Sequence, residues 1–178
     1  VSRTLRTSHD LDTVRGSRVR PVTIRSKNSA IKLGVAGFNW GTDSYQKSYK
    51  EQFMKEAKRL GIAVTDYDAQ GSIETQVEQI KALIKQKVDV IILWPVNSKD
   101  RQLIAVLETA KSASIPIVLT NTSIVSSALR LVRAYAGPDN FMEGRLAAHM
   151  MNEGLNGQRK IIEVQGFPGY STALERTQ

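Results

Sequence analysis

The side chains of this sequence that are best suited to recognise a small polar molecule follow apolar, strand-like runs. Asn and Asp side chains can hydrogen-bond to neighbouring hydroxyl groups, and aromatic rings pack on the C–H face of a sugar ring. The candidates are, in chain order, Asn39, Trp40, Asp43, Tyr45, Trp94, Asn97, Asn121, Thr122, Asp139 and Asn140. This set favours binding of a polyhydroxylated small molecule over chemical catalysis.

The two tryptophans are the most informative members of this set. Trp40 follows the apolar run 31–36, and Trp94 follows the run 88–93. If these runs are neighbouring parallel strands, both indoles lie beside the crevice at their carboxyl ends, where open α/β sheets bind ligands. Several candidates also have a purely structural interpretation, because Asn140 can cap a helix and Asp43 favours a helix N-terminus.

Sequence signatures of an enzyme are missing. The chain has no glycine-rich nucleotide-binding motif and no G-x-S-x-G nucleophile turn. It has no cysteine, and its two histidines, His9 and His149, stand far apart with no obvious acidic or serine partner. We therefore expect no catalytic residue, no cofactor and no metal site.

The elements that must position the candidate residues alternate regularly from residue 30 onward. Apolar runs predict strands at 31–36, 62–67, 88–93, 115–119, 131–136 and 160–164. Helical periodicity predicts helices at 44–60, 72–87, 98–113, 140–153 and 171–178, with Ser44, Ser72, Ser98 and Asn140 as expected caps. Strands that alternate with helices of this length predict an α/β fold with a doubly wound parallel sheet.

The positive charge is concentrated at the start of the chain. The formal net charge is +8, yet residues 1–29 carry seven Lys and Arg against Asp10 and Asp12. The remaining residues carry 18 Lys and Arg against 15 Asp and Glu, so this part is nearly balanced and we expect no nucleic-acid partner. Residues 1–29 lack a sustained hydrophobic period and are expected to form a basic flexible leader.

Four stretches of the chain together resemble one known family. They read KEAKRLGIAVTDYDAQGSIETQVEQIKALIKQKVDVIILWPVNS, SIPIVLTNT, AGPDNFMEGRLAAHMM and GQRKIIEVQGFPGYSTALERTQ. In this order and at this spacing they resemble the type I periplasmic sugar-binding proteins. This ribose-binding-protein-like group shares its fold with lac-repressor-type effector domains.

The resemblance implies two Rossmann-like lobes that close by a hinge over a ligand in the cleft between them. It places a first lobe at 30–138 and the first crossover, with an incomplete start of the second lobe, at 139–178. The implied function is the solute-binding component of an ABC-type importer. Its partners would be a monosaccharide or related polyol and a membrane permease, and its location the periplasm, with the export signal absent from this chain. The alternative is a ligand-sensing effector domain of a regulator or receptor.

The sequence departs from the family pattern at several places. Tyr45 matches one of two aromatic residues expected after the first strand, but Gln46 stands at the second. Trp94 stands where ribose binders carry Asn, and Asn121-Thr122 replaces an Asp-Arg pair. The cleft is therefore expected to be less charged and more aromatic than a ribose site. Family members also continue further, so the chain looks truncated, and the strand 160–164 is expected to expose apolar edges that favour self-association.

Overall fold

The computed structural model describes residues 31–156, 160–166 and 170–178, so the expected leader at 1–29 lies outside the described residues. The elements run in the order β1 (Lys32–Gly37), α1 (Ser44–Arg59), β2 (Ala63–Asp68), α2 (Ile73–Lys85), β3 (Val90–Leu93), α3 (Arg101–Ser112), β4 (Ile117–Thr120), the 3-10 helix η2 (Ser126–Leu131), β5 (Ala134–Ala136), α4 (Asn140–Leu155) and α5 (Ser171–Thr177). The alternation confirms the order of elements predicted from the sequence up to α4.

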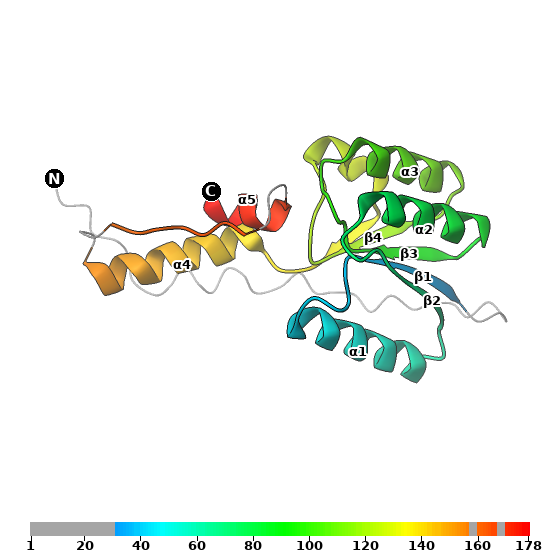
Figure 1. The fold of residues 1–178 in the computed structure, drawn as a ribbon, viewed down its shortest axis with the longest axis horizontal. Coiled ribbons are helices and arrows are strands. Elements are labelled where there is room, and N and C mark those ends of the chain that lie inside the picture. Colours follow the sequence, from blue (N-terminus) through cyan, green and yellow to red (C-terminus); the bar gives the residue numbers. More distant parts are fainter. Residues whose placement is uncertain (1–30, 157–159, 167–169) are drawn as a thin grey trace.

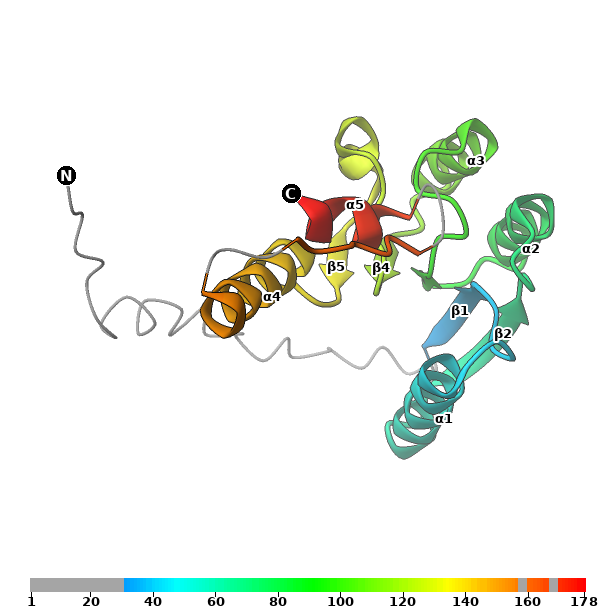
Figure 2. The ribbon, with the colours of Figure 1, turned by 60° about the vertical axis from the view of Figure 1, so that its left-hand side comes forward.

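The strands form one parallel sheet in the order β2-β1-β3-β4-β5. Helix α1 covers one face of this sheet, while α2, α3 and η2 cover the other (Figure 1). Helices α4 and α5 lie beyond the edge where the strands end (Figures 1 and 2). This arrangement confirms the α/β fold with a doubly wound parallel sheet, and it brings the loops after all strands to one edge.

The core lies mainly between the sheet and helices α2 and α3. Its fully buried side chains alternate along the strands and recur at helical spacing, as the apolar periodicity requires: Ile80, Leu83, Ile91, Leu93, Leu103, Leu107, Ile117 and Leu119. A smaller cluster on the α1 side contains Leu33, Val35, Trp40 and Trp94. Burial of apolar surface at about 25 cal/mol per Å² is the main force that holds these layers together.

A buried glutamine of α2 ties together the ends of two central strands. Gln76 Nε2 donates to Trp94 O at 2.8 Å and lies within 3.4 Å of the Ala36 and Gly37 carbonyl oxygens. Its Oε1 accepts from Val96 N at 2.9 Å. The Ala36 and Gly37 carbonyl oxygens also accept from Trp94 N and Ala69 N, so the side chain supplies a missing partner only to Trp94 O and Val96 N.

The helix caps differ from the sequence prediction at three of the four positions. Ser72 caps α2 as predicted, and its Oγ accepts from Thr75 N at 3.1 Å. The predictions of Ser44, Ser98 and Asn140 as caps are wrong, since Asp43, Asp100 and Asp139 cap α1, α3 and α4. An aspartate in extended conformation lies one or two residues from each predicted position, and its carboxylate accepts from first-turn N–H groups while also favouring the helix dipole.

The strand predicted at 160–164 is absent. Residues 160–166 have no regular secondary structure, and Ile161, Ile162 and Val164 are exposed. No strand lies beside this segment among the residues that the structure describes, so its backbone has no ladder to join. The fifth strand is also shorter than predicted, because the 3-10 helix η2 takes up Leu131.

Helices α4 and α5 pack directly on each other. Gly144 of α4 faces the backbone of Arg176, and a Cβ atom at this glycine would overlap the Arg176 carbonyl group. Arg176 in turn pairs with Glu143 of α4 at 2.5 Å and donates from Nε to Asn140 Oδ1 at 3.2 Å. Because glycine has no side chain, Gly144 allows α5 to approach α4 closely enough to form these contacts.

We predict that Gln76→Met lowers the free energy of unfolding by about 3 kcal/mol, because it leaves the Trp94 carbonyl and the Val96 N–H buried without their partner. Gln79→Met in the same helix is the matched control. It removes one hydrogen bond, from Nε2 to Asp68 O at 2.8 Å, and should cost about 1 kcal/mol. Urea titration measures the free energy of unfolding of both variants. Equal losses in the two variants would contradict the special role of Gln76.

Gly144→Ala is expected to destabilise the protein by about 1–3 kcal/mol, because the added methyl group collides with the backbone of α5. Gly154→Ala in the same helix is the control, since a Cβ atom there meets nothing within 4 Å. The control should gain up to about 1 kcal/mol from the better helix propensity of alanine. Denaturant titration measures the free energy of unfolding of both variants. A Gly144→Ala protein as stable as the parent would argue against tight α4–α5 packing.

Candidate functional site

A cavity of about 440 Å³ lies where the strands end, between the sheet loops and the α4–α5 pair. It is lined by residues of α1, of the loops after β3, β4 and β5, and of the segments that form α4 and α5. The lining residues are Asp43, Tyr45, Gln46, Trp94, Asn121, Pro138, Glu143, Tyr170, Thr172 and Arg176. The cavity thus occupies the edge of the sheet where the sequence predicted a binding site.

Trp94 forms the aromatic floor of this cavity. It is only 2% exposed, and its ring meets Tyr49 edge-on at 5.3 Å and Tyr45 edge-on at 6.0 Å between centroids. Tyr45 is 58% exposed and stands at the cavity wall, where its hydroxyl donates to Asn121 Oδ1 at 3.0 Å. These two rings give the site one buried and one accessible aromatic surface.

Trp40 lies beside Trp94 but is not part of the cavity wall. The two indole centroids are 6.0 Å apart, as expected for tryptophans after neighbouring strands, yet Trp40 is only 6% exposed. Its Nε1 donates to Asp66 Oδ1 at 3.1 Å and its ring stacks on Tyr49. The expectation that both indoles face a ligand therefore needs correction, because Trp40 is packed under α1 and supports Trp94 from behind.

Four of the ten predicted site residues line the cavity, namely Asp43, Tyr45, Trp94 and Asn121. Asn39 and Asn97 instead form local turns, in which their Oδ1 atoms accept from Gly41 N at 3.3 Å and Lys99 N at 3.0 Å. Short Asn side chains commonly bond to the backbone two residues onward in this way. These two side chains shape the loops that carry the site.

The predicted residues at the entrance to α4 make contacts inside the protein. Asp139 caps α4, where its Oδ1 accepts from Met142 N at 3.0 Å. Asn140 is buried, and its Nδ2 donates to Glu175 Oε2 at 3.0 Å. Thr122 is also buried, with its Oγ1 3.5 Å from that of Thr172 on α5. None of these three side chains lines the cavity, and only Thr122 connects its two walls.

The sequence analysis missed six lining residues: Gln46, Pro138, Glu143, Tyr170, Thr172 and Arg176. Gln46 had a signal, because it follows Tyr45 at a position where the resemblance expects an aromatic residue. Glu143, Thr172 and Arg176 stand on helices whose sequence contains nothing that assigns a facing surface. They join the site only because α5 folds back against α4.

The loop after β4 is held in a conformation that suits asparagine. Asn121 has a φ of 59°, in the left-handed region that asparagine tolerates better than most residues. Tyr135 Oη donates to the Asn121 carbonyl at 2.9 Å, and burial raises the pKa of this tyrosine. The Asn121 side chain is thereby directed toward Tyr45 at the cavity wall.

The charges around the cavity are unevenly distributed. Asp43 and Glu143 contribute carboxylates and Arg176 one guanidinium group, which pairs with Glu143. Burial raises the pKa of Tyr170 to about 12, although side-chain hydrogen bonds with Trp94 and Thr122 act in the opposite direction. Tyr170 therefore stays neutral, and its ring packs edge-on against Phe38 at 5.4 Å.

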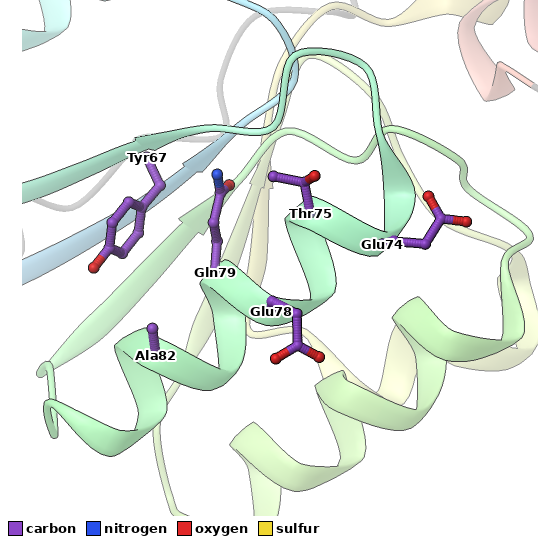
Figure 3. Close-up of a pocket in the computed structure, with 6 residues that line it drawn as sticks. All are labelled: Tyr67, Glu74, Thr75, Glu78, Gln79 and Ala82. Carbon is purple, nitrogen blue, oxygen red and sulfur yellow. The ribbon is translucent and has the colours of Figure 1, made fainter.

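A second hollow lies on the outer surface of α2 (Figure 3). It measures about 490 Å³, and its polar side chains do not converge: Glu74 and Glu78 point away from Tyr67 (Figure 3). Only one aromatic ring lines it, and all of its lining residues come from β2 and α2. We therefore take the cavity at the strand ends as the candidate site.

Two further classes of site were searched in the part of the chain that the structure describes. Within 31–156, 160–166 and 170–178, no group of three or more His, Cys, Asp or Glu side chains is arranged to hold a metal ion. None of the described helices has the length and apolar character needed to cross a membrane.

Known proteins with similar sequences and structures are binding proteins. Residues 34–178 match a family described as a periplasmic binding protein domain. The chain is 29% identical over 150 residues to the ribose import binding protein of Bacillus subtilis (strain 168), covering 84% of this chain and 47% of that protein. It is 32% identical over 149 residues to the galactofuranose-binding protein of Escherichia coli (strain K12), covering 83% and 46%.

Solved structures agree with these relatives. The periplasmic binding protein of the arabinose ABC transporter from Shewanella sp. ANA-3, bound to α- and β-L-arabinofuranose, superposes with a TM-score of 0.75 at 29% identity. That match covers 82% of this chain and 47% of the other. The chain spans about half the length of the curated relatives it matches. With the family match over most of its length and the same parallel sheet, the chain belongs to the periplasmic binding protein family.

Proposed function

We propose that this chain is the solute-binding component of an ABC-type importer and holds an uncharged monosaccharide or related polyol in the cavity at the strand ends. The observation that carries the proposal is the pairing of Tyr45 and Trp94 with polar side chains around this cavity. Aromatic faces shed water against the C–H surface of a sugar, and the polar groups between them hydrogen-bond to its hydroxyls.

The charge of the lining favours an uncharged ligand. Glu143 and Arg176 neutralise each other across 2.5 Å, which leaves the carboxylate of Asp43 as the excess charge. A sugar phosphate or sugar acid would face this negative charge with no free cation among the lining residues, whereas a neutral polyol would not be repelled.

We also propose that the cavity closes by a hinge, and the way the two walls are joined supports this. The chain passes from β5 to α4 through residues 137–139, and we assign 30–138 to one lobe and 139–178 to the other. Within the described parts of the chain, few polar contacts are recorded between them, among them Ser171 Oγ accepting from Ser123 N at 3.0 Å. A short linker with few crossing contacts suits a rotation that encloses the ligand between the lobes.

The partner and location proposed here come from the relatives. Their names describe ribose import, binding of a galactofuranose and an arabinose ABC transporter, and one of them is called periplasmic. From these names we propose that the partner of this chain is a membrane permease and that its location is the periplasm. Binding without chemistry agrees with the position of His149, which is exposed on α4 beside Glu153 and does not line the cavity.

We predict that Tyr45→Ala weakens binding about tenfold or more, because it removes the accessible aromatic face of the site. Calorimetric titration of D-ribose, D-galactose, L-arabinose, D-xylose, xylitol and myo-inositol measures the effect. The unfolding free energy should change by less than about 0.5 kcal/mol, since the side chain is exposed. Tyr45→Phe is the control and should keep most of the affinity. If no probe binds the parent, or if Tyr45→Ala binds as tightly, the proposed site is wrong.

Self-association is a second property that one observation favours. Ile161, Ile162 and Val164 are exposed apolar residues in a segment without regular secondary structure, and Ile162 is 94% exposed. Clustered exposed apolar residues favour association with another chain. We propose that two copies of this chain associate through residues 160–164.

Sedimentation velocity over a range of concentrations tests this association. The parent should show a concentration-dependent dimer, and Ile162→Lys should shift it to monomer, because a charge on the segment opposes burial. Leu60→Lys is the matched control, since Leu60 is an exposed leucine at the end of α1. A parent that stays monomeric throughout would overturn the association.

A further inference from the structure

Gln46 is a buried polar residue whose side-chain oxygen has no hydrogen-bond partner among the residues that the structure describes. It stands in the first turn of α1 and is 6% exposed, and its Oε1 atom is shielded from solvent without a hydrogen-bond partner. The residue lines the cavity at the strand ends. A buried acceptor left unpaired destabilises the folded state, so a residue of this kind is expected where a ligand supplies the missing donor.

Several of the polar groups that line the cavity are already engaged with the protein. The Gln46 backbone N donates to Asp43 Oδ1 at 2.8 Å as part of the α1 cap. The Tyr45 hydroxyl donates to Asn121, and Glu143 is paired with Arg176. None of these groups is available to donate to Gln46 Oε1 without giving up its own contact. A donor carried by the ligand would satisfy this oxygen without breaking any of them.

The chemistry of an amide differs from that of the aromatic residue that the family resemblance expects at this position. An aromatic ring there would offer a stacking face and accept any flat apolar surface. An amide oxygen accepts a hydrogen bond from O–H or N–H, and it is left unpaired when the ligand has neither. The exchange therefore converts a contact that tolerates many ligands into one that discriminates between them.

We propose that Gln46 Oε1 accepts a hydrogen bond from one particular hydroxyl of the bound polyol and thereby selects ligands that carry this hydroxyl over their deoxy analogues. The proposal rests on the proposed function of the cavity and specifies one determinant of its selectivity. A ligand that presents an ether oxygen or a carboxylate at this point is disfavoured, because two acceptors would face each other beside the carboxylate of Asp43.

The test compares the parent chain with Gln46→Met, which is similar in length but lacks the acceptor. The probes are D-ribose, D-galactose, L-arabinose, D-xylose, xylitol and myo-inositol, followed by the monodeoxy derivatives of whichever binds most tightly. For the parent, removal of one hydroxyl should weaken binding about tenfold through this contact. Gln46→Met should bind the complete probe about tenfold more weakly and bind that deoxy analogue as tightly as the complete probe.

Thermal unfolding separates this role from a structural one. Gln46→Met should melt at the same temperature as the parent or higher, because it removes an unpaired buried acceptor. Gln79→Met is the matched control, since Gln79 Oε1 is also buried without a partner but lines the hollow on α2 shown in Figure 3. The control should leave affinity and deoxy discrimination unchanged.

The outcomes distinguish this inference from the proposed function. If no probe binds the parent, both are overturned. If a probe binds and every deoxy analogue binds equally well, or if Gln46→Met keeps the discrimination of the parent, only the role of Gln46 is overturned. Loss of discrimination at one hydroxyl in Gln46→Met, with Gln79→Met unaffected, supports it.

Discussion

The hydrogen bonds of Gln76 fix the point at which the central strands separate into loops. One buried amide bonds to the Trp94 carbonyl, to Val96 N and to the end of β1. These backbone groups leave the sheet in the interior of the protein, where unpaired polar atoms are costly. The position of Trp94, and with it the floor of the cavity, follows from this constraint, so the site depends on a side chain that does not line it.

Some aromatic residues near Trp94 pack in the core, and one is accessible at the cavity. Trp40, Tyr49 and Phe53 stack in sequence under α1, and the carboxylate of Asp66 holds both the Trp40 indole and the Lys50 ammonium group. Tyr45 stands at the exposed end of this row. Rigid support behind an accessible ring reduces the conformational entropy that binding would cost, which suits a site that must hold a small ligand.

The opposite wall is assembled from two helices that meet through a glycine and a buried asparagine. Gly144 allows α5 to approach α4, and Asn140 contacts both Glu175 and Arg176. Arg176 is thereby set against Glu143 at the cavity. The two walls thus differ in construction. One consists of loops that follow the strands of the sheet, and the other depends on contacts between α4 and α5.

The sequence by itself determined the parallel α/β sheet and the edge at which the site lies, because apolar period and loop position are local properties that burial enforces. It also placed Asp43, Tyr45, Trp94 and Asn121 at this edge. Only the tertiary structure decided that Trp40 is packed beneath α1, that 160–164 has no strand to pair with, and that Gln46, Glu143 and Arg176 line the cavity. These features depend on which surfaces pack together in the folded chain, and no local sequence pattern specifies those contacts.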